Sequence, residues 1–111
     1  MIATTIEQSK HLLELGLDIK TADMIWMSGK WLYSIKDNIL DKEDFREMDT
    51  LAWSLSALLE VMKKFNPEVA LASDNTWYCR CDKVESEYCD NPFTAAYDVL
   101  CWLINKGLIN K

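Results

Sequence analysis

Apolar residues recur at helical spacing in three stretches of the chain. The first stretch follows Thr4, which has the spacing of a capping box with Glu7. It stops near Gly16, where a glycine readily takes the left-handed conformation that ends a helix. We therefore predict a helix over residues 5–15. The apolar face of this helix consists of Ile6, Leu12, Leu13 and Leu17.

The other two helical stretches carry their own start and stop signals. Ser54 is a typical N-cap for the second, and Asn66-Pro67 ends it because the residue before a proline is pushed out of the α region. Asn91-Pro92 opens the third, with proline at the first helical position, and Gly107 ends it. The second has apolar residues at Leu55, Leu58, Leu59, Met62 and Phe65. The third is apolar nearly all round, which predicts the central helix of the core.

Shorter apolar runs between turn residues predict strands. Met24–Met27 and Lys30–Tyr33 flank Ser28-Gly29, where glycine can take positive φ, and this pattern indicates a hairpin. Further strands are predicted at Glu68–Ala72, at Thr76–Asp82 and at Glu87–Cys89. The element order is then α-β-β-α-β-β-β-α, without βαβ regularity. We expect a single α+β domain over residues 1–111, with an antiparallel sheet of four to five short strands packed against three helices.

Composition and charge exclude several classes of protein. Half of the 111 residues are apolar, and Gly and Pro number only 3 and 2, so a compact domain is expected. The 18 acidic residues outnumber the 12 basic ones, and Lys63-Lys64 is the longest basic run, so we expect no direct contact with nucleic acid. No secretory signal and no apolar run of about 18 residues is present. We expect a cytoplasmic protein without membrane contact.

The residue patterns of common catalytic sites are missing. His11 is the only histidine, and it lies beside the apolar face of the first predicted helix, where a role at the edge of the core is expected. There is no G-x-S-x-G elbow, and the three isolated glycines form no phosphate-binding loop. We expect a protein that is not an enzyme and has no cofactor, although a pocket built from distant residues leaves no linear signature.

The cysteines are the candidates for a metal or redox site. Cys79 and Cys81 point to the same face of a predicted strand. The turn after this strand decides whether Cys81 lies opposite Cys89 or opposite Tyr88, and both registers remain open. Only the first register gathers Cys79, Cys81 and Cys89 in one patch, and their spacing differs from that of common zinc modules. We expect reduced thiols packed as small apolar side chains and no metal.

Aromatic side chains are concentrated in the predicted hairpin. Trp26 and Trp31 flank its turn near cross-strand positions, Tyr33 is adjacent, and Trp77 recurs on a later strand. The hairpin is apolar on both alternating faces, which a one-sided antiparallel strand does not require and which three short helices do not easily cover. Core packing explains many aromatic strands, but Trp and Tyr also concentrate in the centres of protein interfaces. We predict that Trp26, Trp31, Tyr33 and Trp77 contribute to a binding surface.

A resemblance to other proteins is carried by three segments. They are Thr5–Lys10 leading into Leu12–Leu17, then Trp53–Glu60, and finally Asp90–Pro92 continuing through Ala95–Tyr97 to Gly107–Ile109. In these segments the chain resembles a group of small uncharacterised proteins encoded in phages and mobile elements of gut bacteria. The resemblance implies an accessory protein that acts in a bacterial cytoplasm, and it assigns no activity to any residue.

Three hypotheses for function follow from the sequence. The first is a small non-enzymatic accessory protein that binds another protein, or itself, through the aromatic hairpin. The second is an acidic inhibitor of a DNA-binding or nuclease enzyme, which would use residues 37–49 and 82–90 to imitate phosphates. The third is a metal or redox module built on the cysteines. A net charge of −6 over 111 residues is modest for phosphate mimicry, so we favour the first hypothesis.

Overall fold

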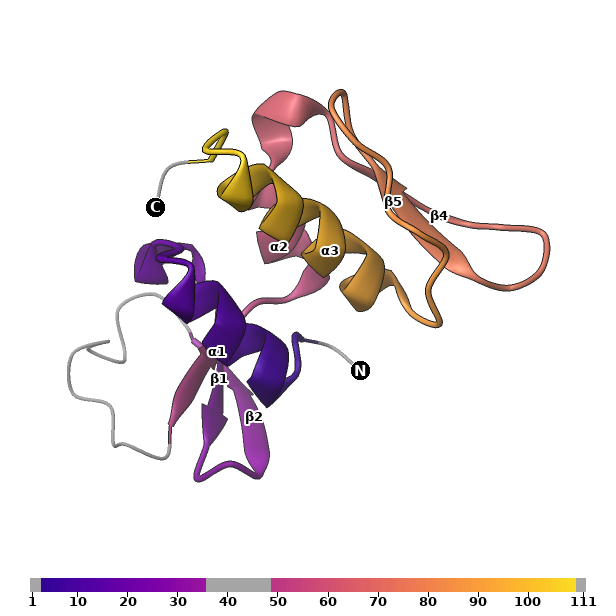
Figure 1. Cartoon of the computed structure of the whole chain (residues 1–111). Helices are drawn as coiled ribbons and strands as arrows, with labels where there is room; N and C mark the ends of the chain where they lie inside the picture. The colour runs from indigo at the N-terminus through magenta and orange to yellow at the C-terminus, as the bar shows by residue number, and fades with distance from the viewer. Residues whose placement is uncertain (1–2, 36–48, 110–111) are drawn as a thin grey trace.

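The computed structural model describes residues 3–35 and 49–109. These residues form three α-helices, two 3₁₀ turns and five strands (Figure 1). In chain order they are α1 (Ile6–Glu14), η1 (Ile19–Thr21), β1 (Met24–Met27), β2 (Trp31–Ser34), β3 (Thr50–Ala52), α2 (Leu55–Val61), η2 (Lys63–Phe65), β4 (Glu68–Leu71), β5 (Trp77–Arg80) and α3 (Pro92–Asn105). The predicted α+β class is confirmed.

The strands form two antiparallel sheets where the sequence predicted one. The first sheet has the order β2-β1-β3, and the second pairs β4 with β5. The strand β3, which precedes α2, was not among the predicted strands. The strand predicted at Glu87–Cys89 is instead a single bridge between Cys89 and Trp77. A three-residue strand such as β3 has too few residues for a visible alternation and depends on pairing with the distant β1. Residues 37–48 of the acidic segment considered for phosphate mimicry lie outside the described residues.

The capping box of α1 is displaced by one residue from its predicted place. Thr5 is the N-cap: its hydroxyl accepts from the Gln8 N–H, and the Gln8 side-chain oxygen accepts from the Thr5 N–H, both at 3.0 Å. Thr4 cannot cap the helix because its hydroxyl is buried and bonded to the Ser9 hydroxyl at 2.7 Å. The prediction of a box from Thr4 and Glu7 was therefore wrong in register, although the helix itself is confirmed.

The other predicted helix signals act as expected, with one difference. The Ser54 hydroxyl accepts from the Ala57 N–H at 3.1 Å, and the Asn91 side chain accepts from the Thr94 N–H at 2.8 Å. Gly107 takes a φ of +73° just after α3, where an L side chain would be strained. The second helix ends at Val61, earlier than predicted, because the chain tightens into η2 before it reaches the proline.

The main core is centred on α3, as predicted. This helix packs against α2 on one side and against the β4–β5 sheet on another (Figure 1). Its buried residues are Phe93, Ala95, Ala96, Val99, Leu100, Leu103 and Ile104. Leu12 of α1, Ile25 of β1 and Leu58 of α2 complete the same cluster. Burying each leucine, isoleucine, valine or phenylalanine side chain of this cluster contributes about 1.5–3 kcal/mol. The packing around α3 therefore holds the layers together.

At β1 and β3 the three-stranded sheet buries residues on both of its faces, but by different means. Ile25 and Leu51 point into the main core, whereas Met24 and Ala52 point to the opposite face. Ala3, just before α1, packs against that opposite face and is fully buried. The sequence suggested that three helices would leave one hairpin face uncovered. The N-terminal segment covers this second face at β1 and β3, in addition to the helices on the first face.

Candidate functional site: the exposed aromatic strand

Two large aromatic side chains of β2 are exposed on one face of the sheet. Trp31 and Tyr33 are two residues apart, so strand alternation places them on the same side, and they are 57% and 54% exposed. They lie opposite Met27 and Ile25 of β1, which pack on the main core. The apolar face of the sheet therefore continues from the core onto an open surface, which we call the β2 surface (Trp31, Tyr33 and the backbone edge of β2).

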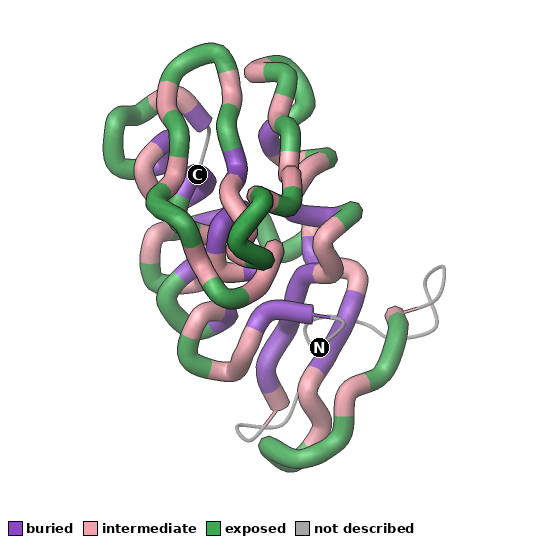
Figure 2. Tube along the Cα trace, turned by 90° about the vertical axis from the view of Figure 1, so that its right-hand side faces the viewer, coloured by how far each residue is buried: buried purple, intermediate pink, exposed green. Residues whose placement is uncertain are grey.

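β2 is also an edge strand. The described residues place β1 on one side of it and no strand on the other. Its sequence, Trp-Leu-Tyr-Ser, has no charge and no proline, and its pairing with β1 has no bulge. Natural proteins often protect an exposed edge strand with a charged residue, a proline or a β-bulge. Figure 2 shows the consequence, with much of the tube along this hairpin exposed or half-buried while the neighbouring β3 is buried.

The outward backbone groups of β2 follow from its pairing with β1. The Ile35 N–H donates to the Asp23 carbonyl oxygen at 2.9 Å, so residue 35 directs its backbone toward β1. Because this direction alternates along an antiparallel strand, Leu32 and Ser34 direct their N–H and C=O groups away from β1. The edge thus presents a row of backbone donors and acceptors beside two exposed aromatic rings.

A tight turn holds the near end of the β2 surface. Ser28 and Gly29 both have positive φ, +56° and +69°, and the Lys30 N–H donates to the Met27 carbonyl oxygen at 3.1 Å. The Ser28 N–H donates to the Asp49 carboxylate at 3.1 Å, which ties the turn to the start of β3. The Lys30 ammonium lies 5.9 Å from the centre of the Trp31 ring. A cation therefore borders one side of the exposed indole.

Of the four predicted site residues, the structure brings only Trp31 and Tyr33 together. Trp26 lies on the opposite face of the sheet, half-buried against the Ala3 cluster, and its indole N–H donates to the Thr4 carbonyl oxygen at 2.9 Å. Trp77 belongs to the second sheet, at the other end of the molecule (Figure 1). The three-residue connection pairs Met27 with Trp31, and this register separates the two tryptophans.

The predicted alternatives for the cysteine register are both incorrect. Cys89 pairs with Trp77, and the Cys81 N–H donates to the Val84 carbonyl oxygen at 2.9 Å, so Cys81 faces neither Cys89 nor Tyr88. Residues 3–35 and 49–109 contain no group of three His, Cys, Asp or Glu side chains able to hold a metal ion. The three-thiol patch required by the metal hypothesis is therefore not formed.

The surroundings of Cys79, Cys89 and Cys101 favour the neutral thiol. Burial raises the pKa of Cys79 to about 12, and the neighbouring Cys81 adds to the effect. Burial raises the pKa of Cys101 to about 11, against a hydrogen bond with Tyr97 that lowers it. Burial also raises the pKa of Cys89, and the nearby carboxylate of Asp98 raises it further. A reactive cysteine needs a lowered pKa, so these three thiols have the character of packing residues.

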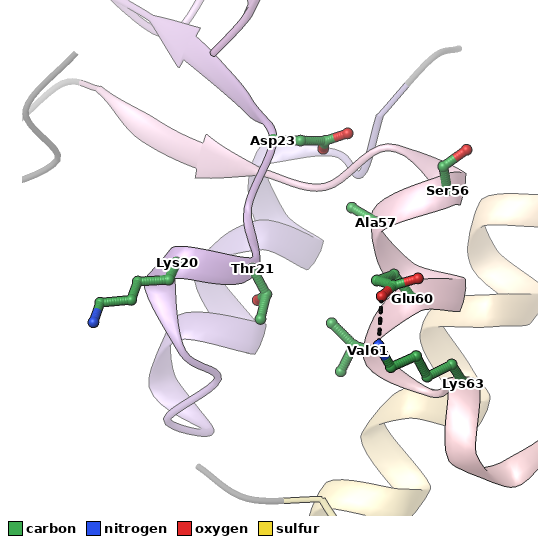
Figure 3. Close-up of a pocket in the computed structure, with 8 residues that line it drawn as sticks. All are labelled: Lys20, Thr21, Asp23, Ser56, Ala57, Glu60, Val61 and Lys63. Atoms are coloured by element: carbon green, nitrogen blue, oxygen red, sulfur yellow. Dashed lines mark hydrogen bonds and ion pairs between the residues drawn. The ribbon is translucent and has the colours of Figure 1, made fainter. Parts of the chain in front are cut away.

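A groove lies between the η1 segment and α2, and the sequence contained no sign of it. It encloses about 670 Å³ and is lined by residues from positions 20–23 and 56–63, which are far apart in the chain (Figure 3). Both carboxylates that line it already have partners: Asp23 accepts from the Ser54 N–H and hydroxyl, and Glu60 binds the Lys63 ammonium at 2.8 Å. That pairing raises the pKa of Lys63, so its amine stays protonated. Both carboxylates of the groove are therefore engaged by neighbouring donors.

His11 has the role at the edge of the core that the sequence suggested. Its side chain is 46% exposed on α1, its ring contacts Tyr97 edge-on with 6.1 Å between the ring centres, and its Nδ1 lies 4.0 Å from Glu14. No described serine or cysteine forms a hydrogen bond with it. The part of the chain that the structure describes thus contains no histidine-based nucleophile pair.

Comparison with protein families, with curated proteins and with solved structures finds no match to this chain. Among the described residues, no helix is long and apolar enough to cross a membrane.

Proposed function

We propose that the protein is a small non-enzymatic accessory protein that binds another protein molecule through the β2 surface. The observation that carries this proposal is the exposure of Trp31 and Tyr33 on one face of an uncharged edge strand. Following the resemblance described above, we propose that it acts in a bacterial cytoplasm, in the setting of a phage or mobile element.

Binding at the β2 surface would remove two free-energy costs of the unbound chain. Exposed aromatic rings keep apolar area in water, at about 25 cal/mol per Å², and Trp and Tyr are enriched among the residues that dominate binding energy. An open strand edge leaves backbone groups bonded only to water, and a partner strand can satisfy them while adding direct contacts. Both features lie on the same four residues, so one partner segment can use both.

The test compares two double variants of matched exposure. Trp31→Ser/Tyr33→Ser removes the rings of the β2 surface, and Leu71→Ser/Tyr88→Ser removes two side chains that are 53% and 64% exposed, one on the second sheet and one packed beside it. Sedimentation velocity of the purified chain, and chemical cross-linking in extracts of a bacterial host, report its association with itself and with other proteins.

We expect the Trp31/Tyr33 variant to weaken association at least about tenfold, because truncating central aromatic residues of an interface commonly costs this much or more. The Leu71/Tyr88 variant should associate as the unaltered chain does. Circular dichroism should show that both variants fold. Equal association of all three proteins, or no association of the unaltered chain with any protein, would overturn the proposal.

A further inference from the structure

We infer that the partner is a second copy of this chain, and that two β2 strands pair antiparallel about a twofold axis. This inference rests on the proposed function and specifies its partner. The edge groups of β2 are self-complementary, because antiparallel pairing of identical strands matches each outward N–H with an outward C=O. Two three-stranded sheets then become one continuous sheet, and the Trp31 and Tyr33 rings of both copies lie on the same face.

The alternation of β2 limits the register of this pair. Facing residues must lie on the same side of the sheet, so the twofold axis passes through Leu32 or through Tyr33. With the axis at Leu32, whose backbone points outward, the two Leu32 residues exchange two hydrogen bonds. Trp31 then lies opposite the partner's Tyr33, twice, in the closely spaced non-hydrogen-bonded positions where side-chain contact is greatest.

The Leu32-centred register also gives better side-chain pairs. An axis at Tyr33 places Trp31 opposite the partner's Ile35, a residue that already packs against its own core. The axis at Leu32 instead forms two aromatic pairs and places Lys30 opposite the partner's Ser34, so no like charges face each other along the strands. Cross-strand aromatic pairs are among the favourable ones. We therefore assign the axis to Leu32.

The area available sets the strength of this dimer. A fully covered Trp or Tyr buries about 150–250 Å². Since Trp31 and Tyr33 are slightly more than half exposed, the four rings of a dimer can bury roughly 500 Å². Even with the strand edges added, the total stays below the about 1,200–2,000 Å² of stable complexes. We expect a reversible dimer that forms at high micromolar concentration and dissociates on dilution.

The first test removes one outward N–H and keeps both rings. Ser34→Pro deletes an N–H that points away from β1, so the hairpin retains its own hydrogen bonds, and proline is tolerated on an edge strand. Ser34→Ala is the matched control because it keeps the N–H. Sedimentation equilibrium should show a dissociation constant for Ser34→Pro at least about tenfold higher than for Ser34→Ala, from the loss of two symmetry-related hydrogen bonds.

The second test reads the register from charge pairs. In the chain Trp31→Lys/Tyr33→Glu, the Leu32-centred axis places each new ammonium opposite a new carboxylate. In Trp31→Lys/Tyr33→Lys, the same axis opposes two ammonium groups at each pair. Both variants lose the aromatic pairs and should dimerise more weakly than the unaltered chain, and at low salt and millimolar concentration we expect the first variant to dimerise several-fold more tightly than the second. An axis at Tyr33 would instead oppose two carboxylates in the first variant and remove its advantage.

The outcomes separate this inference from the proposed function. A chain that stays monomeric at millimolar concentration overturns the inference, and so does dimerisation that Ser34→Pro leaves unchanged. The proposed function survives either result if Trp31→Ser/Tyr33→Ser abolishes binding to a different protein while Leu71→Ser/Tyr88→Ser does not. Dimerisation that is lost in Ser34→Pro but retained in Ser34→Ala, with circular dichroism unchanged, supports the inference.

Discussion

Thr4 connects α1 with the three-stranded sheet and with the start of α2. Its hydroxyl bonds to the Ser9 hydroxyl of α1 at 2.7 Å and accepts from the Trp53 N–H at 3.1 Å. Its N–H donates to the Trp53 carbonyl oxygen at 2.9 Å, and its own carbonyl oxygen accepts from the Trp26 indole. Thr4 and Ser9 are both fully buried, so water cannot replace these bonds. The side chain and backbone of this one residue thereby fix α1 to the sheet and to the start of α2.

Replacing Thr4 by valine should destabilise the protein by about 2–3 kcal/mol. Valine has nearly the same shape but cannot bond, so the Ser9 hydroxyl and the Trp53 N–H would be buried without a partner, at about 1–3 kcal/mol each with some relaxation. Urea unfolding followed by tryptophan fluorescence measures the change.

The double variant Thr4→Val/Ser9→Ala serves as the control, because it removes one of the two stranded groups. It should be more stable than Thr4→Val alone. A Thr4→Val protein as stable as the unaltered chain would contradict the role assigned to this hydroxyl.

At the scale of elements, the turn between β1 and β2 positions the β2 surface. Ser28 adopts a left-handed φ of +56°, which costs a serine free energy, and Gly29 follows with +69°. A Cβ at Gly29 would meet no atom within 4 Å, so the demand at that position is purely conformational. In this turn, Gly29 suits the left-handed conformation, whereas Ser28 adopts it at a cost.

Ser28→Asn should stabilise the hairpin by a few tenths of a kcal/mol, because asparagine tolerates the left-handed region better than serine does. Gly29→Ala should destabilise it by about 1 kcal/mol, since an L side chain is strained at this φ. Thermal unfolding by circular dichroism should show opposite shifts in Tm for the two variants. Shifts of the same sign would mean that the turn relaxes into another conformation.

At the scale of the whole molecule, net charge controls how two copies approach. Each chain carries −6, and the centres of two copies in contact are separated by at least about twice the 13.9 Å radius of gyration. At this separation roughly a third of the repulsion remains in about 10 mM salt, where the Debye length is about 30 Å, and almost none remains at 0.15 M. Salt should therefore favour association through an uncharged edge.

Raising salt from about 10 mM to 150 mM should lower the dissociation constant of the dimer by roughly tenfold, as screened Coulomb repulsion between the two chains predicts. Sedimentation equilibrium at several salt concentrations measures this. An acidic inhibitor that binds a basic enzyme should show the opposite trend, with affinity lost as salt rises. The sign of the salt effect therefore discriminates between the two hypotheses.

Most of the caps and turns that depend on a few neighbouring residues were predicted correctly from the sequence. The caps at Ser54 and Asn91 and the turn at Gly29 were predicted because each depends on its immediate neighbours and on φ preferences. The capping box at α1 was misplaced by one residue because two adjacent threonines were available. The hydrogen bonds of Thr4 with Ser9 and with the distant Trp53 decided which threonine caps the helix.

The candidate site was predicted in part, for a related reason. The concentration of aromatic residues pointed to the hairpin, but alternation alone did not say which ring faces the core and which faces solvent. The pairing of Met27 with Trp31 decided this, together with the Ala3 segment that covers the side of Trp26. The groove beside α2 joins positions about 35 residues apart and has no local signal at all.

The sequence by itself determined the class of the fold, the three helices, the hairpin, and the absence of common catalytic motifs. These properties depend on residues that are close along the chain. The tertiary structure alone decided the division into two sheets, the cysteine register, and the exposure of Trp31 and Tyr33 rather than Trp26. These properties depend on which distant segments compete for the same apolar face. That competition is settled by packing and backbone pairing across the whole molecule.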